Sequence, residues 1–188
     1  MIRLRLATEA DAAAILDIYA PFVRETHVSF EYEIPDVADI QGRIHKTLQH
    51  YPYLVAEQAD QILGYAYAGS FRYRTAYSWS CESSIYLHPD AIGTGLAQRL
   101  YRALLDVLKA QGFQTVYAGI SLPNAASQAF HRKMGFQHLQ VFRRIGFKQG
   151  QWHDVDFWEL VIDQKDNKPT LPRSIQAFRV AELKEILG

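Results

Sequence analysis

A strand-like run that ends in a two-glycine turn, followed at once by a long amphipathic helix, most limits how this chain can fold. Residues 84–87 lead into the turn, which holds Gly93 and Gly95, and a helix is expected over Leu96–Gln111. Glycine has no Cβ, so the backbone of the turn can approach a ligand closely. The first helical turn adds free N–H groups and the positive end of the helix dipole. The sequence therefore predicts an anion site, suited to a phosphate group, built from backbone atoms.

Two common phosphate-binding motifs are excluded by what the turn lacks. A dinucleotide-binding fingerprint needs a third glycine at position 98, where this chain has Gln98. A nucleoside-triphosphate loop needs the sequence Gly-Lys-Ser/Thr, and the turn contains no lysine. Most isolated Gly-x-Gly pairs are simple turns, so the interpretation depends on the motifs C-terminal to this helix.

The composition fits one globular domain without a membrane or nucleic-acid partner. The chain has 188 residues, 48% of them hydrophobic, and its 20 basic residues balance its 20 acidic ones. No apolar run approaches the roughly 18 residues that cross a bilayer, and the N-terminus lacks a signal-peptide core. The lone cysteine, Cys81, excludes a disulfide within the chain and fits a reducing compartment, so a cytoplasmic location is expected.

Hydrophobic periodicity predicts one α/β domain over residues 1–163. Strands are expected at residues 2–6, 53–57, 62–69, 79–87, 115–120, 137–147 and 154–162. Helices are expected at about residues 8–23, 36–51, 96–111 and 124–135. Residues 164–188 form a polar linker and a short amphipathic helix capped at Ser174. This tail either packs on the domain, contacts a second subunit or stays mobile.

Beyond the glycine turn, Asn124 begins a short helix that ends in Gly135-Phe136, and this ordered set resembles the GNAT superfamily of acyl-CoA-dependent N-acetyltransferases. Within that superfamily the chain is most similar to phosphinothricin acetyltransferases and methionine sulfoximine or sulfone acetyltransferases. The likeness covers about residues 1–163 and is carried by residues 81–86, 122–124, 131–136 and 150–155.

The resemblance implies a fold, a co-substrate and an assembly. The implied fold is a mixed, mostly antiparallel sheet of six to seven strands, flanked by about four helices and splayed after the fourth strand. Acetyl-CoA is the implied co-substrate, no metal is expected, and a homodimer is implied. His45 and His50 are five residues apart, which is not the i, i+4 spacing of a helical metal site.

The resemblance also implies that backbone groups hold the coenzyme. The expected coenzyme-binding residues are Tyr86, Leu87, His88, Ile92, Gly93, Thr94, Gly95, Leu96, Ala97, Asn124 and Lys133. Asn124 caps its helix, contacts the pantetheine arm, or does both. Asp90 stands where the family pattern has Arg or Gln. Its carboxylate would repel a pyrophosphate, so we expect it to face solvent.

Acetyl transfer to an amine needs a base, donors for the oxyanion and a proton for the leaving thiolate. Glu82 is the candidate base, because its neighbours are apolar or small and partial burial raises a carboxyl pKa. The alternative is an ordinary solvated strand glutamate. His131 either protonates or holds the thiol sulfur, or is a helix-surface or capping histidine. Cys81 adjoins Glu82, so it points to the opposite face and is expected to be a buried structural thiol.

Arg72 and Arg74 are the candidate substrate-binding residues. An i, i+2 pair in an extended segment puts both guanidinium groups on one face, and arginine suits carboxylate, phosphinate or sulfone oxygens. The alternative is a solvated basic loop. Phe30 and Tyr32 are candidates to wall the pocket, with plain core packing as the alternative, and Tyr77 is a further candidate. Trp152 and His153 are candidates to shape it, including across a dimer interface.

The sequence thus predicts an enzyme that moves the acetyl group of acetyl-CoA to the amine of a small amino-acid-like substrate. Two alternatives remain. One is an N-acetyltransferase for another amine, such as a peptide N-terminus, a lysine or a polyamine. The other is a non-catalytic CoA-binding module, against which the presence of Glu82 weighs.

Overall fold

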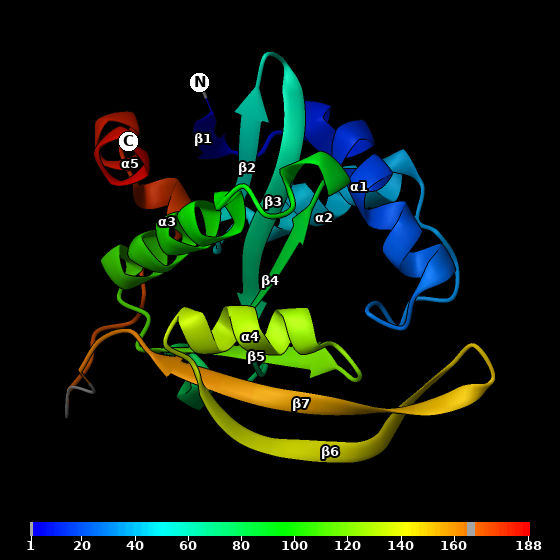
Figure 1. Ribbon diagram of the computed structural model, residues 1–188. Helices are drawn as coiled ribbons and strands as arrows, with labels where there is room; N and C mark the ends of the chain where they lie inside the picture. Colours follow the sequence, from blue (N-terminus) through cyan, green and yellow to red (C-terminus); the bar gives the residue numbers. More distant parts are fainter. Residues whose placement is uncertain (1, 165–167) are drawn as a thin grey trace.

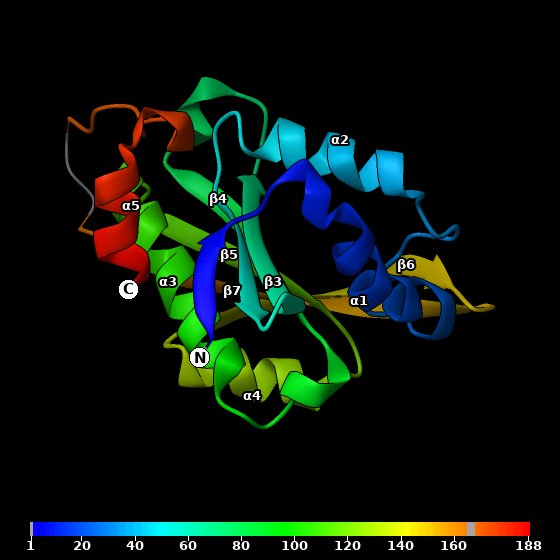
Figure 2. The ribbon, with the colours of Figure 1, turned by 90° about the horizontal axis from the view of Figure 1, so that it is seen from above.

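The computed structural model describes residues 2–164 and 168–188, and it contains a single mixed sheet with helices on both faces (Figures 1 and 2). The strands are β1 (Arg3–Leu6), β2 (Tyr53–Gln58), β3 (Gln61–Ser70), β4 (Ser80–Leu87), β5 (Thr115–Ser121), β6 (Gln137–Lys148) and β7 (Gln151–Val161). The helices are α1 (Ala12–Glu25), α2 (Val37–Thr47), α3 (Leu96–Gln111), α4 (Ala125–Lys133) and α5 (Val180–Leu187). The strand order β1-β2-β3-β4-β5-β7-β6 confirms the expected fold.

The sheet separates between β4 and β5, its only parallel pair of neighbouring strands in the described residues. The register pairs there are Ser80 with Thr115, Cys81 with Val116 and Glu82 with Tyr117. Past Glu82, β4 stays paired with β3, while β5 continues along β7. The expected splay after the fourth strand is therefore confirmed, and it leaves one edge of β4 without a neighbouring strand.

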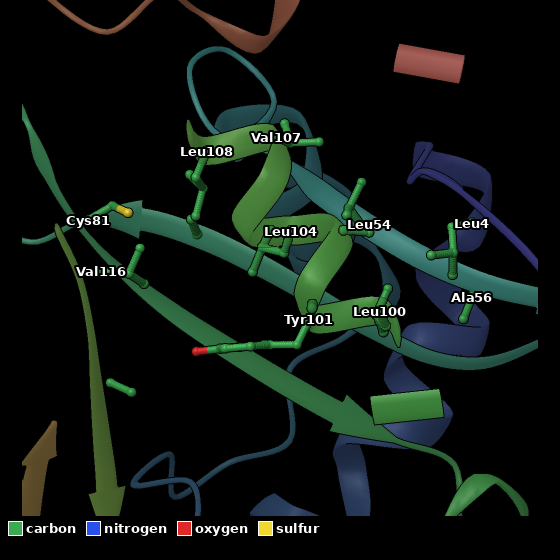
Figure 3. Close-up of a cluster of buried hydrophobic side chains, with 14 of the residues drawn as sticks. Leu4, Leu54, Ala56, Cys81, Leu100, Tyr101, Leu104, Val107, Leu108 and Val116 are labelled. Atoms are coloured by element: carbon green, nitrogen blue, oxygen red, sulfur yellow. The ribbon is translucent and has the colours of Figure 1, made fainter. Parts of the chain in front are cut away.

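Each face of the sheet has its own hydrophobic core. The apolar stripe of α3 packs onto one face, where Leu100, Leu104 and Leu108 are fully buried near Val116 of β5 (Figure 3). The i, i+4, i+8 spacing of these leucines is the pattern that predicted this helix. Helices α1 and α2 cover the other face and form a second core. Burying one leucine contributes about 1.5–3 kcal/mol, so the two cores hold the sheet from both sides.

The β6–β7 hairpin is longer than expected, because its turn is tighter. Strand β7 begins at Gln151 and not near residue 154. Gln149 and Gly150 both have positive φ angles, 52° and 77°, as a two-residue hairpin turn requires. Pairing therefore starts immediately after the turn, and Trp152 and His153 belong to the strand.

The short helix expected in the tail is present as α5, but it does not begin at Ser174. Ser174 does act as a cap, since its Oγ accepts from the Gln176 N–H at 3.1 Å, but it begins only a 3₁₀ turn, Ile175–Ala177. Phe178 then adopts an extended backbone and separates this turn from α5. Ile175 and Phe178 are buried in the same core as α3, so the tail packs on the domain. Part of the expected linker, residues 165–167, lies outside the described residues.

Candidate active site

A narrow cleft of about 70 Å³ opens where β4 and β5 part. Its walls come from both strands, from α4 and from the segment after α1, and they comprise Val28, Ser83, Ser84, Ile85, Tyr86, Ala118, Gly119, Ile120, Ser121, Asn124, Ser127 and His131. An unpaired strand edge offers N–H and C=O groups to an extended ligand that contains amides. The cleft can therefore hold such a ligand in the manner of an added strand.

The free edge of β4 presents backbone groups from alternate residues. The N–H of His88 donates to the Leu63 carbonyl at 2.9 Å, so this amide faces β3 and is already engaged. Backbone groups alternate between the two edges of a strand. Leu87 and Ile85 are therefore the residues that present N–H and C=O to the cleft, and of the residues expected from sequence, Leu87 fits best.

Glu82 lies at the point where the strands separate. Its cross-strand partners are Gly69 in β3 and Tyr117 in β5. A Cβ on Gly119 would stand 3.4 Å from Glu82 Oε1, so the carboxylate lies against a glycine of β5. Burial raises the pKa of Glu82, and the nearby Arg72 offsets part of that increase. The half-buried side chain thus has the raised proton affinity of a base and differs from a fully solvated strand glutamate.

Cys81 points the other way, as expected. Its side chain is fully buried beneath α3, and Sγ is 3.9 Å from the Thr115 carbonyl oxygen (Figure 3). Burial raises the pKa of the thiol well above its ordinary value, which keeps it protonated. Cys81 is a structural residue of the core.

His131 is buried on the inner side of α4, which excludes a position on the helix surface. Its Nδ1 is 2.9 Å from the Ser127 carbonyl oxygen, to which it donates. The neutral ring then presents Nε2 as an acceptor to Tyr101 Oη, 3.4 Å away, and that hydroxyl lies 2.7 Å from Ser83 Oγ. Burial lowers the pKa of His131, so the neutral form is favoured near pH 7. The histidine thus ends a buried chain of polar groups that begins on β4.

The candidate base and the candidate histidine approach the cleft from opposite faces of the sheet. Side chains alternate along a strand, so Glu82 and Tyr86 share the face covered by α1. The ring of Tyr86 packs there against Tyr19 of α1, with 5.2 Å between the ring centroids. Ser83 lies on the α3 side, with Tyr101 and His131. The opening between β4 and β5 connects the two sides.

The glycine turn has the predicted backbone conformation. Gly93 and Gly95 have φ angles of 79° and 84°, in the left-handed region where a side chain would be strained. Thr94 Oγ1 donates to the Ala91 carbonyl at 2.8 Å and holds the turn together. The N–H groups of the first turn of α3, which begins at Leu96, have no helical partners, as at any helix start.

Beside the two glycines, Ile92 has an amide that is already engaged, and Asp90 has an exposed side chain. The Ile92 N–H already donates to the Pro89 carbonyl at 3.1 Å, so this amide is the least suited of those expected to bind phosphate. The Asp90 side chain is 76% exposed and 3.5 Å from His88 Nδ1. The expectation that Asp90 faces solvent is confirmed.

Asn124 is the N-cap of α4, as predicted, because its Oδ1 accepts from the Ser127 N–H at 3.1 Å. It also lines the cleft, so its amide NH₂ can serve a ligand at the same time. Lys133 is exposed at the other end of α4 and does not line the cleft.

Aromatic rings connect the loop after β3 with the Glu82 site. Phe71 stacks on Tyr117 with 4.3 Å between centroids, and Tyr77 meets the edge of Phe71 at 6.3 Å. The Arg72 guanidinium lies 4.3 Å from the centre of the Phe71 ring. Because Tyr117 is the register partner of Glu82, the stack places Arg72 and Tyr77 beside the candidate base.

Arg72 and Arg74 line one hollow of about 440 Å³, which agrees with the expected common face. The opposite wall is Leu171 and neighbouring residues of the tail. Neither arginine forms an ion pair with a carboxylate of the described residues, so both charges are available to an anionic group.

Phe30 does not line the cleft. A Cβ added to Gly146 would lie only 2.3 Å from Cζ of Phe30, so the Phe30 ring packs directly on the β6–β7 hairpin. Val28, two residues earlier in the same segment, does line the cleft. His153 is buried, with its ring centroid 6.2 Å from that of Phe30, and Trp152 is half exposed on the hairpin. Sequence reasoning missed Gly119, although a glycine inside a strand is itself a signal of close approach.

Neither clustered metal ligands nor a membrane-spanning helix is found among the described residues. Within residues 2–164 and 168–188, no three His, Cys, Asp or Glu side chains gather as metal ligands. In the same part of the chain, no helix combines the length and hydropathy needed to cross a bilayer.

Known proteins are similar to this chain in both sequence and fold. Residues 4–157 match the family model described as an acetyltransferase (GNAT) domain. The chain is 37% identical over 158 residues to phosphinothricin N-acetyltransferase of Streptomyces viridochromogenes, covering 84% of this chain and 86% of the relative. It is 33% identical over 162 residues to L-methionine sulfoximine/L-methionine sulfone acetyltransferase of Salmonella typhimurium, covering 86% and 95%. A GNAT superfamily phosphinothricin acetyltransferase from Sinorhizobium meliloti, solved in complex with AcCoA, superimposes with a TM-score of 0.85 at 35% identity, covering 90% and 93%.

Proposed function

The chain belongs to the GNAT family and is an acetyl-CoA-dependent N-acetyltransferase, and from this premise we propose that it acetylates the amine of a small amino acid, with Glu82 as general base. The proposed substrates are of the phosphinothricin or methionine sulfoximine and sulfone type, after the names of its relatives. One observation carries the proposal. The half-buried Glu82 carboxylate, with its raised pKa, lies where β4 leaves β5 and the cleft opens.

The residues of the cleft suit acetyl-CoA as the second substrate. Its pantetheine arm contains amides that match the free edge of β4 at Leu87 and Ile85. Its pyrophosphate suits the turn at Gly93 and Gly95, around which a Cβ would meet nothing within 4 Å. Acetyl-CoA supplies the activated carbonyl, and the protein supplies position and proton transfer.

Glu82 takes a proton from the substrate ammonium, directly or through a water, because only the neutral amine attacks a thioester. A backbone N–H on the free edge of β4 donates to the oxyanion that forms. His131 acts by position and not as an acid, since its buried ring is neutral and accepts from the Tyr101 hydroxyl. Arg72 binds the carboxylate of the amino acid.

An amine panel tests this proposal. Purified protein is mixed with acetyl-CoA and phosphinothricin, methionine sulfone, methionine sulfoximine, a polyamine, a lysine peptide or a peptide with a free N-terminus, and thiol release is followed. We expect turnover with the first three. Turnover only with the polyamine or the peptides would replace the substrate class. Coenzyme binding without turnover on any amine would support a non-catalytic module.

We further propose a homodimer formed through β6. This edge strand exposes a row of apolar side chains in a single chain, namely Leu139, Val141, Ile145 and Phe147. Exposed apolar edge strands invite pairing with another chain. Light scattering after size exclusion should give twice the chain mass, and Val141→Lys should give the monomer mass.

A further inference from the structure

A second, larger cavity lies next to Glu82 on the α1/α2 face of the sheet, with a volume of about 520 Å³. Phenol rings form most of its wall, from Tyr19, Tyr53, Tyr65 and Tyr67, and we call it the tyrosine cavity. Gly69 also lines it, and Gly69 is the register partner of Glu82. Glu82 itself does not line the cavity, but its charge acts on Tyr67 of the wall, so carboxylate and cavity lie near each other on the same face of the sheet.

The rings of the tyrosine cavity are held in a fixed stack. Tyr53 and Tyr67 are 4.9 Å apart with an angle of 14° between their planes, and Tyr53 and Tyr65 are 5.7 Å apart at 20°. The three residues come from paired strands, β2 and β3, where cross-strand neighbours share a face. A flat ring that enters the cavity would meet preorganised aromatic walls.

Two hydroxyl groups in this wall lack a protein partner. Tyr53 and Tyr65 are only 4% and 2% exposed, yet no described residue forms a hydrogen bond with either hydroxyl. Buried phenols normally find such a partner. The buried side-chain atoms that are both sealed and unpaired are found on Gln111, Ser121 and Asp156, so the two phenols open onto the cavity. They are available to a bound molecule.

The charged groups that line the tyrosine cavity lie on α2. Arg43 forms a two-bond ion pair with Glu31, which is not part of the lining, at N–O distances of 2.6 and 2.9 Å, and Lys46, which does line the cavity, is exposed to solvent. Tyr19 donates to the same Glu31 carboxylate at 2.8 Å. Burial raises the pKa of Tyr53 and Tyr65 well above the ordinary value, so both phenols stay neutral. A charged side chain packed against these neutral phenols would lose its hydration without gaining a charged partner.

The cavity and the hollow of Arg72 and Arg74 are adjacent, because Ser70 and Tyr73 line both. An amino acid bound with its amine at Glu82 can thus direct its carboxylate to Arg72 and its side chain to the tyrosines. Three separate contacts fix its orientation.

We propose that the tyrosine cavity binds the side chain of the amine substrate and accepts α-amino acids with an uncharged aromatic side chain. The inference rests on the proposed function, since it places the amine at Glu82. An apolar cavity of about 150 Å³ already holds benzene. The tyrosine cavity, at about 520 Å³, has room for a phenyl or indole ring, far more than a methyl sulfone needs.

Separate measurements of binding and turnover test the proposed role of the tyrosine cavity. Calorimetric titration with phenylalanine, tyrosine and tryptophan should show binding, and each should be acetylated with kcat/KM at least equal to that of methionine sulfone. No binding of any aromatic amino acid overturns the inference, even if methionine sulfone is acetylated. Binding without acetylation of any amine keeps the cavity assignment and overturns the proposed function.

Two matched glycine variants locate the site. Gly69→Leu puts a side chain into the open space beside Glu82, where a Cβ meets nothing within 4 Å. Gly42→Leu adds the same group on α2, also into open space, away from the cavity lining. We expect Gly69→Leu to weaken phenylalanine binding at least tenfold and Gly42→Leu to leave it unchanged. Equal affinity in both variants would overturn the assignment.

A hydroxyl deletion gives a second route that adds no bulk. Tyr65→Phe should lower kcat/KM severalfold for tyrosine and tryptophan, whose rings carry a polar atom, and leave that for phenylalanine unchanged. An equal effect on all three substrates, or on none, would contradict a role for the free phenol.

Discussion

On the α1/α2 face of β4, Glu82, Ser84 and Tyr86 stay partly exposed, whereas on the opposite face Cys81 and Ser83 are buried. The first face carries the candidate base, whose pKa is raised, and its Ser84 and Tyr86 line the cleft. The second face is packed under α3, and its Ser83 is bonded to Tyr101 and also lines the cleft. The two faces thus differ by alternation, since one presents the carboxylate and the other holds the core and positions His131.

The sharpest way to break this comparison is Glu82→Gln, which removes the base and keeps the shape. We expect kcat/KM near pH 7 to fall about 10²–10⁴-fold, the usual contribution of a positioned base. Glu185→Gln, at an exposed site on α5, is the control and should keep wild-type kinetics. Full activity in the Glu82 variant would mean that another group takes the proton.

The Glu82→Gln variant should lose activity but gain stability relative to the wild type. Because the folded-state pKa of Glu82 is raised, the folded protein disfavours the ionised form. This destabilises the wild type increasingly as the pH rises above the ordinary value of 4.5. Denaturation at pH 5 and pH 8 should therefore show Glu82→Gln gaining stability relative to wild type at the higher pH. A loss at pH 8 would indicate a structural role for the carboxylate.

On the packed face, Tyr101→Phe is expected to have the next largest effect. The hydroxyl lies between Ser83 Oγ and His131 Nε2, and both would lose it as a partner. Leaving buried polar groups unpaired costs about 1–3 kcal/mol. Urea denaturation measures this loss, with Tyr73→Phe as the control, because Tyr73 is fully exposed. If His131 acts by position, kcat should fall while the KM for the amine stays the same.

Cys81→Ala tests whether the thiol on the packed face takes part in the chemistry. The thiol is buried and sits one residue from the base, but on the other side of the strand. Removing one buried atom of this size costs about 1 kcal/mol. We expect that small loss in denaturation experiments and unchanged kcat. A large loss of turnover in a folded Cys81→Ala protein would place the thiol in the reaction.

Local pattern was enough to predict the division of β4, because alternation is a property of the strand itself. It also predicted the turn at Gly93 and Gly95, whose backbone demands are local. Contacts between distant segments were not predictable in this way. Phe30 was expected at the pocket but rests on Gly146, 116 positions away in the sequence.

The tyrosine cavity shows the same limit more clearly. Its rings come from residues that look like ordinary core aromatics in the sequence. Only the pairing of β2 with β3, which sets Tyr53 opposite Tyr67, stacks them and leaves two hydroxyls free. The family resemblance could predict a coenzyme site in advance, because that prediction depends on local motifs. The substrate pocket depends on strand register and helix placement, which one sequence does not specify.

Asp90 belongs to neither face of β4, and its replacement should have the smallest effect. It follows the strand, and its side chain is 76% exposed. Exposed charges are screened by solvent and salt, so Asp90→Asn should lower the KM for acetyl-CoA no more than about threefold at low ionic strength. The difference should vanish in high salt, and Asp17→Asn on α1 should cause none. A tenfold or larger fall in KM would show that the carboxylate turns toward the phosphates when the coenzyme binds, and that the turn after β4 does not keep its conformation.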